Sequence, residues 1–255
     1  MAEVVIVRDA GEAGELAASL IETVVRDKPD AVLGLATGST PLTTYAALAA
    51  RGLDLSAVRA FALDEYVGLP EGHPQSYRAV IAREAVTPLG LDPAKVRVPG
   101  DDGGPLAGAG DRYERAIADA GGIHVQLLGI GRTGHIGFNE PGSSLASSTR
   151  IKTLTEQTRA DNARFFDSPD EVPKHCLTQG LGTILRSRQL ILLAFGEGKA
   201  QAVAGAVEGP VTASLPGSVI QLHPEVTVIV DEAAASRLAN ADYYRFAWEN
   251  RHDLG

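Results

Sequence analysis

Cysteine is nearly absent from this 255-residue chain, and so is any long uninterrupted apolar run. The single cysteine, Cys176, has no partner for a disulfide within the chain, which favours a reducing compartment and predicts a cytoplasmic protein. No apolar run approaches the length of a membrane span. Residues 4–7 (VVIV) lack the basic flank and the length of a signal peptide, so we expect them to form a first strand.

An excess of basic residues is also missing. The formal net charge is -9, whereas non-specific nucleic-acid binding needs a dense cationic surface. Hydrophobic residues make up 44% of the chain, which is enough for a sizeable core. We therefore expect no nucleic-acid partner and no membrane partner. An anionic small molecule is still a possible substrate, because cations grouped at a binding site can outweigh the negative charge of the whole protein.

The lone cysteine stands beside His175, and a Cys–His pair can act as a nucleophile. The side chains of two adjacent residues, however, rarely point toward each other as a catalytic pair requires. We therefore interpret Cys176 as a small buried residue.

Short β-branched runs alternate with amphipathic stretches along most of the chain. Strands are predicted at residues 4–7, 31–36, 59–63, 96–98, 123–129, 189–195 and 226–230, and helices near 11–27, 41–50, 76–86, 106–120, 198–207 and 232–239. Near-continuous apolar strands flanked by helices predict an α/β fold, Rossmann-like, with a mostly parallel sheet covered on both faces. The Gly- and Pro-rich residues 99–110 read as a loop, so we expect one domain over residues 1–255.

A long insertion near residues 142–180 interrupts this alternation. It contains a strand-like stretch at residues 149–155 and a helix-like stretch at residues 156–166. Long excursions from a compact sheet are often lids or binding loops, and a surface element without a functional role is the equally open alternative.

Residues 34–45 (GLATGSTPLTTY) carry hydroxyl groups where parallel sheets bind ligands, beyond the carboxyl ends of the strands. Pro41 suits the start of a helix, because its missing N–H costs nothing there. A helix N-terminus with such residues can hold a phosphate, although ordinary capping explains them too. The lysine of a nucleotide P-loop is absent, so a compact phosphate fits better than a triphosphate. The predicted contacts are Thr37, Gly38, Ser39 and Thr40.

Two acids, Asp64 and Glu65, follow the apolar strand at residues 59–63. Side chains alternate along a strand, so the two carboxylates should point to opposite faces. A carboxylate among apolar groups can have a raised pKa, which suits a general base, and we expect Asp64 to be that base. The plainer alternative is that one acid caps a turn and the other is solvated. No His or Cys cluster accompanies them at ligand spacing, so we predict no metal.

Residues 127–144 (LLGIGRTGHIGFNEPGSS) contain the pattern G-x-G-x-x-G directly after an apolar run. A dinucleotide-binding turn needs a helix that starts at the third glycine, but Gly137 and Pro141 would end any helix here. We therefore predict that no dinucleotide cofactor binds at this turn. The glycines would let the backbone turn and place His135 in a cleft, where Glu140 can orient it and hold its tautomer. A structural histidine is the alternative.

Lys199 is expected in the first turn of a helix that follows the strand at residues 189–195. A lysine is unfavourable there against the helix dipole. Its position therefore indicates that an anion binds at that end of the helix.

Taken together, these segments resemble glucosamine-6-phosphate deaminases over most of the chain, from about residue 30 to beyond residue 230. The matching stretches are residues 36–48 (ATGSTPLTTYAAL), 63–77 (LDEYVGLPEGHPQSY), 128–155, 162–166 (NARFF), 172–185 and 196–200 (GEGKA). The related phosphogluconolactonases share the scaffold but carry a different sequence where GHIGFNEP stands here. The resemblance implies conversion of glucosamine 6-phosphate and water to fructose 6-phosphate and ammonia, without metal or organic cofactor.

The resemblance also implies roles for individual residues. Asp64 would move a proton between C2 and C1, and His135 would open the pyranose ring with Glu140 oriented behind it. The phosphate contacts would include Ser39, Thr40, Arg164 and Lys199, so that the insertion carrying Arg164 acts as a lid.

One residue departs from the family pattern. Thr133 stands where the family commonly has an acidic residue or asparagine, two positions before the histidine. A threonine hydroxyl can donate or accept a hydrogen bond but carries no negative charge. A strict carboxylate–His–carboxylate relay is therefore in doubt, and His135 and Glu140 would suffice for ring opening.

Some members of the family are hexamers that bind an activator, N-acetylglucosamine 6-phosphate, between subunits, whereas others are unregulated. The corresponding positions here are Ser143, Arg150, Lys152 and Thr153. The resemblance thus leaves open both a homo-oligomer and an allosteric site.

Two other functions remain as alternatives to the deaminase. One is a lactonase or an aldose–ketose isomerase acting on another sugar phosphate. The other is a sugar-phosphate sensor of a transcriptional regulator, which should carry a helix-turn-helix domain and a basic surface. The acidic composition and the early first strand argue against the sensor.

Overall fold

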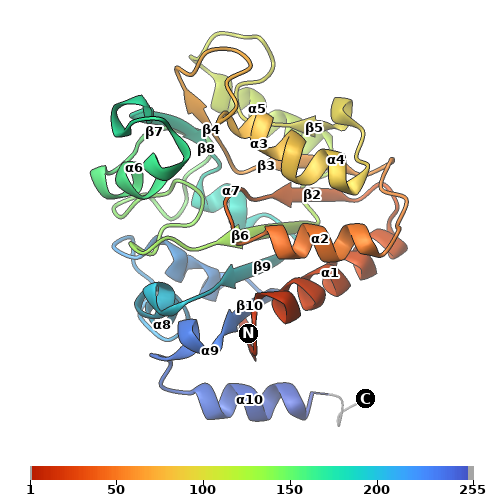
Figure 1. Ribbon diagram of the computed structural model, residues 1–255, viewed down its shortest axis with the longest axis vertical. Coiled ribbons are helices and arrows are strands. Elements are labelled where there is room, and N and C mark those ends of the chain that lie inside the picture. The colour runs from red at the N-terminus through yellow and green to blue at the C-terminus, as the bar shows by residue number, and fades with distance from the viewer. Residues whose placement is uncertain (1, 252–255) are drawn as a thin grey trace.

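A computed structural model describes residues 2–251 of the chain. Its main sheet has seven strands in the order β1-β10-β9-β6-β2-β3-β5, and every neighbouring pair is parallel (Figure 1). The strands are β1 Ala2–Val7, β2 Val32–Leu35, β3 Arg59–Ala62, β5 Val96–Arg97, β6 Val125–Gly129, β9 Gln189–Ala194 and β10 Val226–Asp231. Each predicted strand is present, with its ends shifted by at most two residues.

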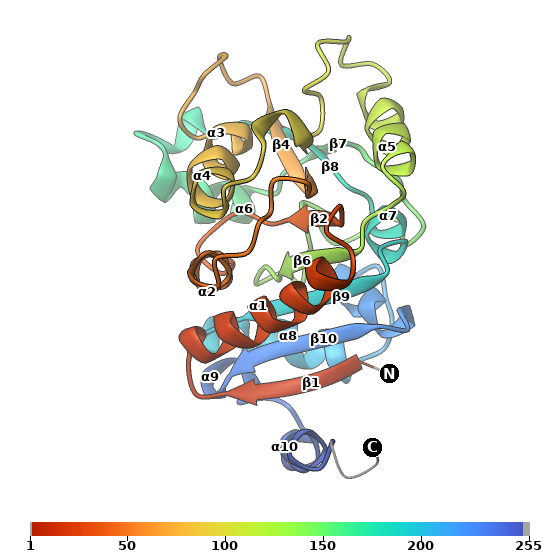
Figure 2. The same ribbon diagram turned by 90° about the vertical axis from the view of Figure 1, so that its right-hand side faces the viewer.

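Helices cover both faces of this sheet, as predicted. The connections through α1 and α2 step across the sheet in one direction, and those through α5 and α8 step back, so right-handed crossovers place the two sets on opposite faces. Figure 2 shows α1 in front of the sheet and α8 behind it. The helices are α1 Ala10–Asp27, α2 Leu42–Ala50, α3 Tyr77–Ile81, α4 Thr87–Leu89, α5 Ala109–Asp119, α6 Glu156–Asn162, α7 Leu181–Leu185, α8 Ala200–Val207, α9 Glu232–Ala235 and α10 Ala241–Glu249.

The strands β2 and β6 lie side by side in the sheet, yet the chain leaves them in opposite directions. Such a reversal of strand order opens a crevice at the carboxyl ends of the two strands, where α/β proteins bind ligands. The predicted phosphate loop follows β2 and the glycine-rich loop follows β6. The topology therefore brings these two loops to one place.

A second, three-stranded antiparallel sheet lies beside the first. It consists of β4 Asp64–Val67, β8 His175–Thr178 and β7 Arg150–Thr153, in the order β4-β8-β7. We predicted a strand near β7 but expected β4 to be a loop and did not expect β8. Both missed strands are four residues long and pair with each other across more than a hundred residues of sequence, so no local pattern marks them.

An apolar cluster under the second sheet contains Tyr66, Phe138, Leu154 and Cys176, with Phe166 packed against it. The Cys176 side chain is fully buried, and burial raises the pKa of its thiol. Its neighbour His175 is exposed, because successive residues of β8 point to opposite sides. Cys176 is thus the buried structural residue that we expected, and the Cys–His pair does not form.

The helices differ from expectation mainly at their ends. The helix predicted near residues 76–86 is divided into α3, a π-helical turn at Ala82–Val86 and α4, and the one predicted near residues 232–239 ends at Ala235. The helices α7 and α10 were not predicted. The latter packs against β1, the edge strand of the main sheet (Figure 1).

Candidate active site

A cavity of about 640 Å³ opens at the carboxyl ends of the main strands. Its walls come from the loops after β2, β6 and β9, from the start of β4 and from α6. Of the residues predicted to be functional, Thr37, Gly38, Ser39, Thr40, Asp64, His135, Arg164 and Lys199 line this cavity. One cleft thus unites residues that lie as far apart in the sequence as positions 37 and 199.

Asp64 begins β4 and is only 6% exposed. Its Oδ1 accepts a hydrogen bond of 3.1 Å from the backbone N–H of Phe138. Burial raises the pKa of Asp64 to about 6, although hydrogen bonds from Thr178 and Phe138 and the nearby His135 act in the opposite direction. The carboxylate can therefore accept a proton near neutral pH and hold it, as a general base must.

The neighbouring acid, Glu65, has a different role. Its Oε1 accepts from the backbone N–H groups of Tyr66 (2.7 Å) and Tyr77 (2.8 Å), and its Oε2 accepts from that of Arg78 (2.8 Å). The two residues at 77 and 78 form the first turn of α3, so Glu65 caps that helix. The predicted division of the two acids, with Asp64 toward the ligand side, agrees with the structure.

The glycine-rich loop presents His135 without forming a helix after Gly134, as predicted. Gly134 has a φ of +78°, which favours glycine. A Cβ on Gly131 would lie 2.1 Å from the His135 ring, so only glycine lets the imidazole pack against this backbone. Asn139 fixes the far end of the loop, since its Nδ2 donates to the carbonyls of Ile136 (2.9 Å) and Gln179 (2.8 Å).

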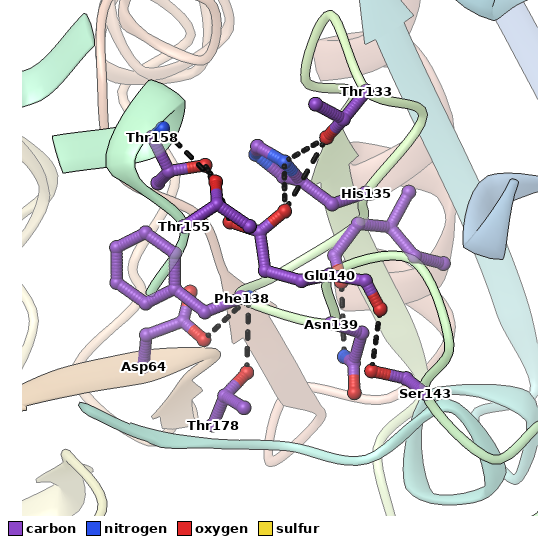
Figure 3. A network of polar contacts seen from close by, with 11 residues as sticks. Asp64, Thr133, His135, Phe138, Asn139, Glu140, Ser143, Thr155, Thr158 and Thr178 are labelled. Atoms are coloured by element: carbon purple, nitrogen blue, oxygen red, sulfur yellow. Dashed lines mark hydrogen bonds and ion pairs between the residues drawn. The ribbon is translucent and has the colours of Figure 1, made fainter. Parts of the chain in front are cut away.

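Glu140 stands behind His135, outside the cavity lining. The imidazole Nδ1 lies 3.4 Å from Glu140 Oε2 and 2.8 Å from the hydroxyl of Thr133 (Figure 3). The Thr133 hydroxyl in turn donates to Glu140 Oε2 at 3.4 Å. Thr133 therefore bridges the histidine and the carboxylate at Nδ1, while His135 also lines the cavity.

Two threonines from the insertion hold the other oxygen of Glu140. Thr155 donates to Oε1 at 3.1 Å, and Thr158 forms a short hydrogen bond with the same atom. Burial by itself would raise the pKa of Glu140, but hydrogen bonds from His135, Thr158 and Thr155 and the charge of His135 outweigh it and lower the pKa to about 2. Glu140 is therefore a fixed anion at any working pH.

Three cations that line the cavity lie close enough to influence one another: Arg132, Arg164 and Lys199. Burial lowers the pKa of Lys199, and the charges of Arg132 and Arg164 lower it further, against the effect of Asp161. Within residues 2–251, none of the three cations has a carboxylate oxygen within 4.0 Å. An anionic group of a ligand would complete this cluster.

The loop between β2 and α2 lines the same cavity as these cations. Gly38 has a φ of +90°, which turns the loop toward the cavity, and Pro41 is the N-cap of α2 rather than its first helical residue. The N-terminus of α2 therefore adds free N–H groups to the hydroxyls of Ser39 and Thr40. This arrangement suits a phosphate.

The four residues matched to an activator site lie outside the cavity. Ser143 is buried and donates to the carbonyl of Glu140 at 2.7 Å, and Arg150 Nη1 donates to Asn139 Oδ1 at 2.8 Å. Lys152 and Thr153 are neighbours on β7, so their side chains point to opposite faces. The four side chains do not converge within one chain.

Sequence reasoning missed several residues of this site. Arg132 was overlooked, although its place in the loop after β6 could have indicated it. The roles of Thr155 and Thr158 at the start of α6, and of Thr178 on β8, depend on tertiary contacts that the sequence does not reveal.

Among residues 2–251, no three His, Cys, Asp or Glu side chains group in a way that could hold a metal ion.

The site and fold agree with comparisons to known proteins. The family model described as "Glucosamine-6-phosphate isomerases/6-phosphogluconolactonase" matches residues 9–229, and the chain belongs to this family. Among its relatives, a glucosamine-6-phosphate deaminase of Bifidobacterium longum (strain DJO10A) is 58% identical, with 98% of each chain covered. One of Rhodococcus opacus (strain B4) is 59% identical, with 98% of this chain and 97% of the relative covered.

Solved structures give the same picture. A monomeric glucosamine-6-phosphate deaminase is 41% identical and superimposes with a TM-score of 0.88, covering 92% of this chain and 99% of that one. The 6-phosphogluconolactonase from Leishmania guyanensis is 22% identical with a TM-score of 0.72, covering 92% and 98%. The likeness to the lactonase shows the shared fold alone.

None of the helices in the described part of the chain is both long enough and apolar enough to cross a membrane.

Proposed function

We propose that this protein converts glucosamine 6-phosphate and water into fructose 6-phosphate and ammonia, as a hydrolytic step of amino-sugar catabolism in the cytoplasm. The whole chain, residues 1–255, would act as one catalytic domain. The observation that carries the proposal is the content of the cavity. A base with a raised pKa and a histidine backed by a fixed carboxylate share it with Arg132, Arg164 and Lys199, which have no carboxylate oxygen within 4.0 Å among residues 2–251.

The phosphate of the substrate would bind between the α2 N-terminus and the three cations. Thr37, Gly38, Ser39 and Thr40 would contribute N–H and hydroxyl groups, and Arg164, Lys199 and Arg132 would neutralise the charge. Binding at this end leaves the sugar carbons beside Asp64 and His135. Arg164 belongs to the segment after α6, so phosphate binding would hold the insertion over the substrate as a lid.

His135 would open the pyranose ring by moving the proton of the C1 hydroxyl to the ring oxygen, which yields the aldehyde. Asp64 would then take the C2 proton, and a proton of the C2 ammonium group would pass to the C1 carbonyl oxygen, leaving an enol-amine with a hydroxyl on C1 and a neutral amine on C2. Return of the proton from Asp64 to C1 produces a ketimine at C2. Water adds to the ketimine carbon and ammonia leaves, which completes fructose 6-phosphate.

Measured ammonia release from glucosamine 6-phosphate tests this proposal directly. The control substrates are 6-phosphogluconolactone and glucose 6-phosphate, which lack the amine. Ammonia and fructose 6-phosphate in equal amounts are expected. Lactone hydrolysis or glucose 6-phosphate isomerisation without ammonia release would overturn the proposal in favour of another sugar-phosphate enzyme.

The phosphate contacts are tested by Arg132→Ala and Lys199→Ala. Each should raise KM for glucosamine 6-phosphate, and activity on unphosphorylated glucosamine should barely change. Arg115→Ala on α5 is a matched control, since Arg115 is exposed and lies outside the cavity. An equal loss on both substrates would instead indicate a structural role.

The activator site at Ser143, Arg150, Lys152 and Thr153 stays a prediction that rests on resemblance. Repeating the ammonia assay with N-acetylglucosamine 6-phosphate, together with the mass of the particle in solution, tests it. Activation of an oligomer would support the site. An unresponsive monomer would remove it.

A further inference from the structure

The carboxylate of Glu140 joins two parts of the molecule that are distant in the sequence. Its Oε2 faces His135 on the loop after β6, and its Oε1 accepts hydrogen bonds from Thr155 and Thr158 (Figure 3). Thr155 is the N-cap of α6, and Thr158 lies in the first turn of that helix. The two oxygens of one carboxylate therefore hold the catalytic loop on one side and the insertion on the other.

Thr158 is the main donor on the insertion side. The Thr155 hydroxyl has one proton to give, and both Glu140 Oε1 and Thr158 Oγ1 lie 3.1 Å from it. Its lone pair already accepts the backbone N–H of Thr158. Thr158 is 3% exposed, and its hydroxyl donates directly to Glu140 Oε1. A buried carboxylate oxygen that lost this donor would be poorly solvated.

The same short segment also reaches the phosphate end of the cavity. After α6 ends at Asn162, the 3-10 turn Ala163–Phe165 carries Arg164 into the cavity lining. Asn162 Nδ2 donates to the Tyr66 hydroxyl at 3.0 Å, which fixes the far end of α6 to β4. One segment of the insertion thus contacts Glu140 at its start and presents a phosphate cation at its end.

We propose that Thr158 is a positioning residue for His135: through Glu140, it ties the orientation of the imidazole to the segment that presents Arg164 to the phosphate. The inference rests on the proposed function, because it assigns His135 to ring opening. A bound phosphate that orders this segment also fixes Glu140, so the histidine is best oriented when a phosphorylated substrate is in place. Thr158 also lines the cavity, so its effect on turnover is assigned to the hydrogen bond with Glu140, and the Glu140→Gln background tests that assignment.

The test compares kcat and KM of the wild type, Thr158→Val, Thr158→Ser and Glu140→Gln, and of the double variant Thr158→Val/Glu140→Gln. Valine matches threonine in shape and has a similar helix propensity, while Thr155 still caps α6. Ala160→Val is the matched control, since it places a β-branched residue on the exposed side of the same helix. Thr158→Ala provides a second variant without the hydroxyl if the valine protein does not fold.

We expect Thr158→Val to lower kcat about tenfold to a hundredfold, the scale of one hydrogen bond to a charged group, with little change in KM. Thr158→Ser and Ala160→Val should stay close to the wild type. In the Glu140→Gln background, the valine substitution should have almost no further effect.

Equal losses from Thr158→Val with and without Glu140→Gln would overturn the inference, as would a loss in Ala160→Val of the same size or a change confined to KM. Failure of the wild type to release ammonia would instead contradict the proposed function. An active wild type with an unaffected Thr158→Val contradicts only the positioning role.

Discussion

Two buried carboxylates flank the cavity, and their surroundings drive their pKa values in opposite directions. Asp64 is 6% exposed and Glu140 is 3% exposed, so both side chains are shielded from solvent. The pKa of Asp64 is raised to about 6, whereas that of Glu140 is lowered to about 2. The cost of burial dominates at Asp64, whereas at Glu140 hydrogen bonds from His135, Thr158 and Thr155 outweigh it.

The contrast assigns a different chemical role to each side of the cavity. Around Asp64, one backbone N–H and the Thr178 hydroxyl only partly offset the cost of burial, so the carboxylate can pick up and release a proton. Around Glu140, His135 and the hydroxyls of Thr155 and Thr158 stabilise the charged form. A pair of acids separated in this way is typical of enzymes that need a base and a fixed anion in one site.

The largest expected effect comes from removing the base. Asp64→Asn should lower kcat by roughly 10²–10⁴-fold with little change in substrate binding, because the amide cannot accept the C2 proton. In the wild type, kcat/KM should fall below about pH 6, as Asp64 becomes protonated. Steady-state ammonia release across pH checks both points. Near-normal turnover of the folded variant would remove Asp64 from the proposed role.

Glu140→Gln should have a smaller effect. The amide keeps the shape of the side chain but loses the charge that supports the imidazole, so kcat should fall about tenfold to a hundredfold, the scale of a charged hydrogen bond. The acid limb near pH 6 should remain, because it belongs to Asp64. The same kinetic assay distinguishes the roles of the two carboxylates. Loss of the acid limb from the pH profile of Glu140→Gln would mean that Glu140 is the titrating base.

Thr133→Val removes the hydroxyl that bridges His135 and Glu140. We expect kcat to fall by at most about tenfold, the scale of one neutral hydrogen bond, since His135 still faces Glu140 directly. His135→Ala is the reference for complete loss of the histidine. If the valine variant were as inactive as His135→Ala, Thr133 would be an essential member of a relay.

The same comparison predicts an effect on stability. The folded-state pKa of Asp64 lies above its unfolded value of 3.8, so the folded protein binds the proton more tightly, and stability is lost as pH rises from about 4 to about 6. The amide introduced by Asp64→Asn does not ionise, so this variant does not lose stability in this pH range. Its free energy of unfolding above pH 6 should exceed that of the wild type by about 1–3 kcal/mol. The difference should vanish below about pH 4. Denaturant unfolding at several pH values measures it, and a destabilised variant at pH 8 would show that Asp64 is favourably charged.

The main sheet could be predicted from the sequence because its strands are short apolar runs whose character is local. Residues 123–129 and 226–230, for example, are apolar along nearly their whole length, as in buried parallel strands. The second sheet could not be predicted, since β4 begins with two acids and pairs with β8, which is more than a hundred residues away. Contacts of that range leave no periodic pattern.

The residues of the site divide in the same way: those that directly follow predicted strands could be predicted, and those defined by tertiary contacts could not. Asp64, His135 and Lys199 follow predicted strands, so the rule that ligands bind beyond the carboxyl ends of strands indicated them. The separation of Asp64 from Glu65 followed from strand alternation. Thr155, Thr158 and Arg132 were missed because each gains its role from a neighbour on another loop.

Direct titration of the two carboxylates tests the central claim, that Asp64 is the proton carrier and Glu140 the fixed anion. Side-chain carboxyl NMR signals can be followed against pH in the substrate-free protein, with Asp64→Asn and Glu140→Gln used to assign them. We predict that the Asp64 signal titrates near pH 6 and that the Glu140 signal stays that of a carboxylate at every pH where the protein is folded. An Asp64 signal that titrates near its ordinary value of 3.8, or a Glu140 signal that titrates near pH 6, would contradict the account.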